Sequence, residues 1–241
     1  TSYTYDGHSY DLVEIGNDCW FAEDLQATVN RAGEDLALNT DYRYPNDDAA
    51  LVEDLGLLYT WSTSMASCPT GWHLASDNEW SAAQVAHGML ESDTYGVGTM
   101  GWQGGEEQVG LDMRDGSFLM YGALADTDKQ YFGTNELGMS LRSMYGYYRP
   151  DLDEPSKSYS QWWTSTKPLA DKGPWYRWLR NDEWDAAGID NIRTGISRWT
   201  TIHWTDERMA KARCVRDGRT SAHRVKLDGS GPCEGATSYT Y

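Results

Sequence analysis

The chain has 241 residues and carries 37 acidic side chains against 20 basic ones, which gives a formal net charge of −17. This charge repels the phosphate backbone and no basic stripe opposes it, so we expect no nucleic-acid partner. No stretch approaches the ~20 consecutive apolar residues of a membrane-spanning helix, and we therefore expect no membrane span.

The first predicted element is a β-hairpin. Residues 2–5 and 8–15 are rich in Tyr, Thr, Val and Ile, and they flank Asp6-Gly7, a dipeptide typical of a type I′ turn. A helix is predicted next over residues 57–67, because Leu57, Leu58, Trp61 and Met65 share one helical face before Cys68-Pro69.

A second helix is predicted from residue 77 onward. Ser76-Asp77-Asn78-Glu79 has the pattern of a capping box, and apolar residues follow it at helical spacing. Glycine is frequent and periodicity weak over residues 93–160, which indicates long loops. Residues 162–217 indicate short strands separated by polar turns. We therefore predict one domain over residues 1–220, followed at 221–241 by a linker segment.

The first five residues, TSYTY, recur letter for letter at the C-terminal end. The second copy consists of Thr237, Ser238, Tyr239, Thr240 and Tyr241. We interpret the recurrence as a sign of a tandem array, because an isolated binding domain does not need to repeat its first strand after its last element. We interpret residues 237–241 as a junction, which is either the start of a following repeat or a strand donated to a neighbouring unit.

The sequence contains four cysteines and no CxxC pair, which argues against a zinc ribbon or a thioredoxin-like site. Four well-separated cysteines in an acidic, Trp- and Tyr-rich chain indicate two disulfides and a secreted, extracellular or cell-surface location. Three connectivities are open at this point.

No catalytic motif is present: the sequence has no GxSxG, HExxH or P-loop pattern. We therefore predict that the chain is not an enzyme and requires no cofactor. Acidic clusters at residues 47–48, 112–115 and 151–154 offer oxygen ligands to Ca²⁺, but none has the spacing of a specific calcium motif. The sequence assigns no metal ligand.

Five phrases, in order along the chain, resemble one family. They are Ile15–Leu25 (IGNDCWFAEDL), Gly56–Trp61 (GLLYTW), Cys68–Trp80 (CPTGWHLASDNEW), Trp162–Thr166 (WWTST) and Arg213–Asp217 (RCVRD). Together they resemble the Fibrobacter succinogenes major paralogous domain, a set of secreted bacterial modules with a C-type-lectin-like fold. Related proteins with this fold include formylglycine-generating enzymes and the variable proteins of diversity-generating retroelements.

The resemblance implies an α+β fold with a small twisted antiparallel sheet, two flanking helices and long loops. It also implies a disulfide between Cys68 and Cys214. In the retroelement proteins, the segment between the WWSST-like and RCVRD-like phrases forms an exposed binding face. The corresponding candidate interface residues here are Trp175, Tyr176, Arg177, Trp178, Trp184, Arg198, Trp199 and Trp204. Aromatic residues and arginine are enriched at interface hot spots.

Two functions are therefore predicted. The first is an extracellular structural or adhesive repeat module that associates head to tail with copies of itself into an array or filament. The alternative is a secreted recognition module that binds carbohydrate or protein through the Trp/Arg-rich face. The terminal repeat favours the first. Under it, we predict that Cys233 forms a disulfide with Cys19 of the following unit, because both flank the open end of that unit's hairpin.

Overall fold

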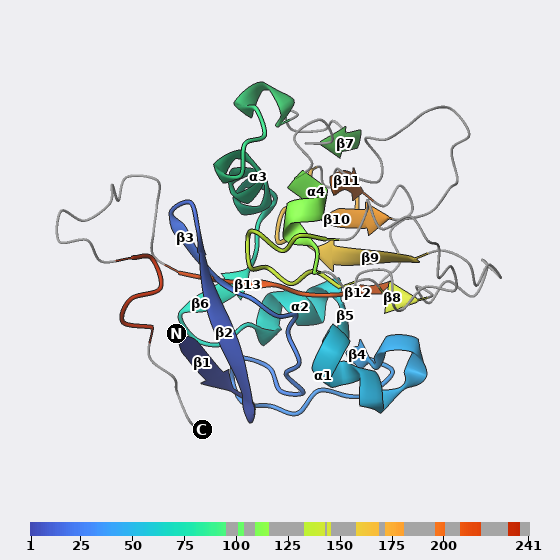
Figure 1. Ribbon diagram of the computed structural model, residues 1–241. Helices are drawn as coiled ribbons and strands as arrows, with labels where there is room; N and C mark the ends of the chain where they lie inside the picture. Colours follow the sequence, from blue (N-terminus) through green and yellow to red (C-terminus); the bar gives the residue numbers. More distant parts are fainter. Residues whose placement is uncertain are drawn as a thin grey trace.

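The computed structural model describes residues 1–94, 101–103, 109–115, 133–142, 144–145, 158–168, 172–180, 196–200, 208–217 and 231–236. These residues form a mixed α+β structure of antiparallel sheets and a few short helices (Figure 1), in agreement with the predicted class. The helices are α1 (Val52–Leu55), α2 (Trp61–Ser67), α3 (Asp77–Ala86) and α4 (Val109–Met113), with 3-10 turns at Pro45–Asp47, Ala49–Leu51 and Glu91–Asp93. Not one of the helices in the described ranges is both long and apolar enough to span a bilayer.

Three sheets contain the strands, here given in their order across each sheet. The first is β1 (Ser2–Tyr5), β2 (His8–Ile15), β3 (Asp18–Phe21), β13 (Cys214–Arg216) and β6 (Trp72–Leu74). The second is β7 (Gly101–Gln103), β11 (Ile196–Thr200), β10 (Trp175–Arg180), β9 (Ser158–Trp163) and β8 (Met144–Tyr145). The third is β12 (Met209–Ala210), β5 (Leu58–Thr60) and β4 (Tyr42–Arg43).

The N-terminal hairpin forms as the Asp6-Gly7 dipeptide predicts. Asp6 and Gly7 have φ angles of 46° and 75°, both in the left-handed region that a type I′ turn requires. Alternation along β1 and β2 directs Tyr3, Tyr5 and Tyr10 into the core, where each is at most 2% exposed. The turn therefore sets the register that buries one face of the hairpin.

Strand β13 lies inside the first sheet although it comes late in the chain. Its Val215 pairs with Trp20 of β3 on one side and with His73 of β6 on the other. The N-terminal hairpin is consequently joined to residues almost 200 positions away, and it lies at one edge of the described structure (Figure 1). This insertion brings the C-terminal segment 231–236 within reach of the hairpin.

The helix predicted over 57–67 begins later than expected. Residues 58–60 form β5, which pairs with β4 and β12, and α2 starts at Trp61. Thr60 caps α2, since its Oγ1 accepts a hydrogen bond from the Thr63 backbone N at 3.2 Å. The prediction was wrong for residues 57–60 because a short apolar run fits a buried strand as well as a helix.

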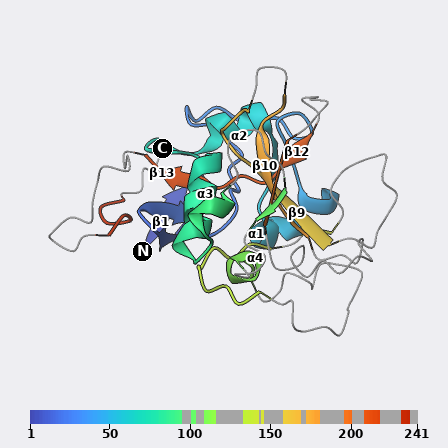
Figure 2. The same cartoon turned by 90° about the horizontal axis from the view of Figure 1, so that it is seen from above.

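Helix α3 begins with the predicted capping box. Ser76 Oγ accepts from the Glu79 backbone N at 3.2 Å, and Glu79 Oε2 accepts from the Ser76 backbone N at 2.7 Å. The buried ring of Trp80 lies 5.2 Å from the ring of Trp20 in β3 and 6.2 Å from that of Trp162 in β9. Both views place α3 between the two larger sheets (Figures 1 and 2). This helix therefore joins the sheets.

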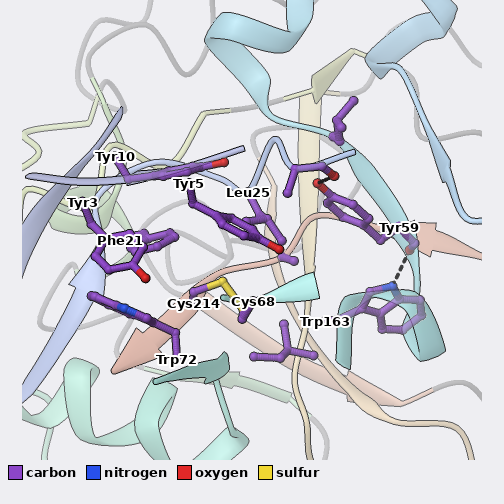
Figure 3. Close-up of a cluster of buried hydrophobic side chains, with 14 of the residues drawn as sticks. Tyr3, Tyr5, Tyr10, Phe21, Leu25, Tyr59, Cys68, Trp72, Trp163 and Cys214 are labelled. Carbon is purple, nitrogen blue, oxygen red and sulfur yellow. Dashed lines mark hydrogen bonds between the residues drawn. A yellow bond between two sulfur atoms is a disulfide. The ribbon is translucent and has the colours of Figure 1, made fainter. Parts of the chain in front are cut away.

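Tyrosines make up much of the largest core cluster, and their hydroxyl groups form hydrogen bonds with the backbone of a neighbouring segment. Tyr5 and Tyr59 donate to the carbonyls of Asn30 and Ala27 at 3.1 and 2.8 Å, and Tyr10 accepts from the Gln26 backbone N at 3.0 Å. Buried tyrosine hydroxyl groups thus form hydrogen bonds with backbone groups of the irregular segment 22–41. Figure 3 shows these rings on both sides of a buried disulfide.

Candidate functional sites

The predicted Trp/Arg face lies mainly in the interior. Trp175, Tyr176 and Arg177 of β10 are 2%, 4% and 0% exposed, and Arg198 of β11 is 3% exposed. Residues this deeply buried cannot contact a ligand outside the protein, so the prediction of a binding surface is corrected for these four.

The remaining members of that face differ from one another. Trp178 is partly buried, and Trp199 is 37% exposed. Trp184 and Trp204 lie outside the described residues. Among the members that the structure describes, only Trp199 is exposed. A single exposed ring does not form a binding face.

Asp77 explains the burial of the two arginines. As the first residue of α3, it accepts from Arg177 Nη2 at 2.7 Å and from Arg198 Nη1 at 2.8 Å, while Arg177 Nη1 donates to Gln84 Oε1 at 2.7 Å. Burial lowers the pKa of Arg177 to about 10, with Asp77 opposing that shift. The Arg177 guanidinium group therefore stays charged at neutral pH, and the contacts of both arginines with Asp77 tie the second sheet to α3.

A second buried carboxylate, Asp24, joins β9 of the second sheet to the segment between β12 and β13. It accepts from Arg213 Nε at 2.6 Å and from Trp162 Nε1 at 2.7 Å, and it forms an ion pair with Lys211 Nζ at 2.9 Å. Burial by itself raises the pKa of Asp24, but Arg213 and Lys211 outweigh burial and hold this pKa below its ordinary value. Asp24 is therefore a buried anion that two cations stabilise.

Sequence reasoning missed both Asp24 and Lys211 as structural residues. Lys211 lies between the apolar residues Ala210 and Ala212, and Asp24 directly precedes Leu25. Charges in such positions are seldom buried unless they are paired. A charged residue next to apolar ones was therefore the sequence feature that could have indicated a buried ion pair.

Two disulfides close within the chain, and the structure describes no free cysteine. Cys68 bonds Cys214 with a Cα–Cα separation of 5.7 Å, as the resemblance implies. Cys19 bonds Cys233 with a Cα–Cα separation of 4.9 Å. The predicted bridge between Cys233 and the following unit is corrected, because β13 carries the C-terminal segment to the hairpin of its own chain.

The segment 231–236 is attached to this hairpin, although the sequence predicts a linker there. The Cys233 backbone N donates to Glu14 Oε1 at 2.9 Å. Arg216 donates to the carbonyls of Pro232, Glu234 and Gly235 at 3.2, 2.8 and 3.0 Å. We call the attached segment, residues 231–236, the C-terminal anchor. The junction residues 237–241 lie outside the described residues.

A half-exposed histidine holds another pair of elements together. His73 of β6 places Nδ1 2.6 Å from Asp217 Oδ1 and Nε2 2.8 Å from Glu79 Oε1. Burial alone lowers the pKa of His73, but Glu79 and Asp217 outweigh burial and raise this pKa above 6.5. These two contacts join β6 to α3 and to the residue that follows β13, and we call the three side chains the His73 clamp.

The acidic clusters proposed for calcium do not form shared ligand shells where they are described. Asp48 Oδ1 accepts from the Ala50 backbone N at 2.9 Å and caps a 3-10 turn. Asp112 lies beside His87, whereas Asp115 bonds Arg142 Nε at 2.9 Å. The cluster at 151–154 is outside the described residues.

Comparison with known proteins agrees with the phrases found in the sequence. No curated protein and no solved structure matches the chain. A family described as the Fibrobacter succinogenes major domain matches residues 13–216. The match includes β3, α3 and β13, together with Asp24, Asp77 and the Cys68–Cys214 disulfide. The chain belongs to the Fibrobacter succinogenes major domain family.

Proposed function

We propose that the chain is a secreted structural module that associates head to tail with copies of itself on a bacterial surface. The observation that carries this proposal is the position of the C-terminal anchor relative to the repeat. The anchor consists of residues 231–236, and residue 237 begins the second copy of TSYTY, whose first copy contains β1. A following hairpin would therefore begin directly after a segment that is fixed to the preceding unit.

The first sheet offers a place for such a strand. β1 is its edge strand and pairs on one side with β2, from Ser2–Asp11 to Tyr5–His8. The second TSYTY has the same sequence as β1, so it can form the same ladder with β2 of another unit or add to the edge of β1. Both arrangements join units through backbone hydrogen bonds.

The compartment and the finer fold also belong to the proposal. Two disulfides persist in oxidising compartments, which supports secretion. We assign the antiparallel sheets with α2 and α3 to a C-type-lectin-like fold because the family match includes them. The net charge of −17 favours solubility of the individual units.

The alternative, a module that recognises glycan or protein, has less support. Four members of its predicted face are buried, and Trp199 is the exposed aromatic residue among those described. Glycan binding by a strictly monomeric chain would favour this alternative over self-association.

Sedimentation velocity at increasing protein concentration tests the structural function. The full chain is compared with a chain that ends at Ala236 and with the double variant S238P/T240P. Proline removes the backbone donors that strand pairing needs. We expect concentration-dependent oligomers for the full chain only, with head-to-tail particles visible by electron microscopy. The proposal is wrong if all three chains remain monomeric throughout.

A further inference from the structure

Three side chains with metal-binding atoms come together from separate parts of the chain. They are His87 at the C-terminal end of α3, Asp112 in α4 and Glu136 in the segment 133–142. Their ligand atoms all lie within 4.8 Å of one another. The group joins three separate segments of the fold.

The arrangement at His87 differs from the clamp at His73. Each ring nitrogen of His73 meets one carboxylate, so hydrogen bonds account for both contacts. At His87 both carboxylates face the same nitrogen: Nε2 lies 2.9 Å from Asp112 Oδ2 and 3.8 Å from Glu136 Oε2. One ring nitrogen has a single hydrogen at most. Hydrogen bonding therefore accounts for one of the two carboxylates.

The separations are compatible with a shared ion. Nitrogen and oxygen ligands bind Zn²⁺ at ~2.0–2.2 Å, so two ligands of one ion are at most about 4.4 Å apart. The distances from His87 Nε2 to the two carboxylate oxygens, 2.9 and 3.8 Å, lie below this limit.

The backbone and a hydroxyl group hold two of the ligands in place. Thr134 Oγ1 donates to Asp112 Oδ1 at 2.9 Å, which leaves Oδ2 directed at His87. The Thr134 backbone N donates to the Leu111 carbonyl at 3.0 Å, and the Leu137 backbone N donates to the Asp112 carbonyl at 3.1 Å. The segment carrying Glu136 is thus fixed to α4 on both sides of that residue, as outer contacts fix ligands in metal sites.

The site is also accessible. The side chains of His87 and Asp112 are 21% and 16% exposed, and that of Glu136 is 65% exposed. An ion can enter from the Glu136 side, and three protein ligands leave coordination positions for water.

We propose that His87 Nε2, Asp112 Oδ2 and Glu136 Oε2 bind one divalent ion of the Zn²⁺ class, which cross-links the end of α3 to α4 and to the segment 133–142. The imidazole ligand favours Zn²⁺ over Ca²⁺, which prefers an all-oxygen shell. The site is independent of the proposed self-association.

Zinc binding to the full chain tests the site. Isothermal titration calorimetry with ZnCl₂, and metal analysis after dialysis, should give one ion per chain. H87Q and E136Q should each weaken binding at least about tenfold. E136Q changes an exposed side chain, so it should leave the fold intact, which circular dichroism checks. Added Zn²⁺ should raise the melting temperature of the unchanged protein but not of E136Q.

The matched control is H73N, which removes a second histidine that, among the described residues, contacts two carboxylates. It should bind zinc as the unchanged protein does. No zinc binding, equal weakening by H73N, or unchanged binding in H87Q and E136Q would each overturn the assignment. Displacement of Zn²⁺ by equimolar Ca²⁺ would overturn the choice of ion.

Discussion

The interior of the molecule and the C-terminal anchor are held together by different means. In the interior, Asp24 and Asp77 each pair with two buried cations that come from distant parts of the chain. The anchor is a short segment on one hairpin, held by the Cys19–Cys233 disulfide and by Arg216. The comparison teaches that the interior contacts determine how the sheets join, whereas the anchor contacts fix a late segment of the chain to the N-terminal hairpin.

The largest expected effect comes from neutralising Asp24. In D24N, Lys211 and Arg213 remain buried without a full counter-charge, and we expect the free energy of unfolding to fall by about 3–5 kcal/mol. Urea unfolding followed by tryptophan fluorescence measures this. The exposed Asp11 gives the control D11N, which should change stability by less than about 0.5 kcal/mol. Equal stability of D24N and D11N would contradict the claim that the buried ion pairs of Asp24 stabilise the interior.

The two disulfides provide a direct contrast between the regions. C68S/C214S should lower the free energy of unfolding by about 2–4 kcal/mol, because this bond ties α2 to β13 inside the core. C19S/C233S should cost about 1 kcal/mol, since the anchor detaches while the core stays folded. Limited proteolysis with mass analysis should show new cleavage near residues 231–236 only in C19S/C233S. Equal stability losses in the two variants would contradict the distinction.

Two arginines allow a further comparison of the anchor with the interior. Each of them donates hydrogen bonds to carbonyl groups near one of the two disulfides. R216Q should speed hydrogen exchange in the anchor and lower the free energy of unfolding by about 0.5–1.5 kcal/mol. Arg31, which donates to the carbonyls of Cys68 and Trp72 at 2.9 Å, gives the matched variant R31Q. R31Q should lower stability without exposing the anchor. Faster exchange of the anchor in R31Q would show that the two regions are coupled.

The smallest expected effect is the pH dependence of the His73 clamp. The pKa of His73 is raised in the fold, so its contribution to stability is present below 6.5 and is lost as the pH rises through the folded pKa. The pKa of Glu79 is lowered, so its contribution is lost only under acid conditions, below 4.5. The difference in melting temperature between the unchanged protein and H73N should therefore shrink as the pH rises above 6.5 and through the folded-state pKa of His73. A constant difference would exclude a charged clamp.

Local patterns in the sequence predicted local structure well. The Asp6-Gly7 turn and the Ser76–Glu79 capping box each depend on residues within a few positions of one another, and both form. The resemblance to the family predicted the Cys68–Cys214 bond correctly. Each of the two cysteines lies in a short phrase that can be recognised from neighbouring residues alone. Residues 57–60 show the limit, since pairing with β4 and β12 made them a strand.

The candidate site could not be predicted in the same way. Arg177 and Arg198 alternate with aromatic residues and resemble an exposed face, but Asp77, about 100 residues earlier, holds them in the core. The group at His87 was equally hidden, because its carboxylates come from segments that share no motif with α3.

By itself, the sequence determined the hairpin turn, the start of α3, the family and the repeat of TSYTY, because each depends on neighbouring residues or on direct comparison of letters. Tertiary structure decided which charges are buried and which chain supplies the partner of Cys19. The physical reason is that β13 enters the sheet beside β3 and brings residues 231–236 to the hairpin of the same chain. Burial and pairing of distant groups are properties of that arrangement.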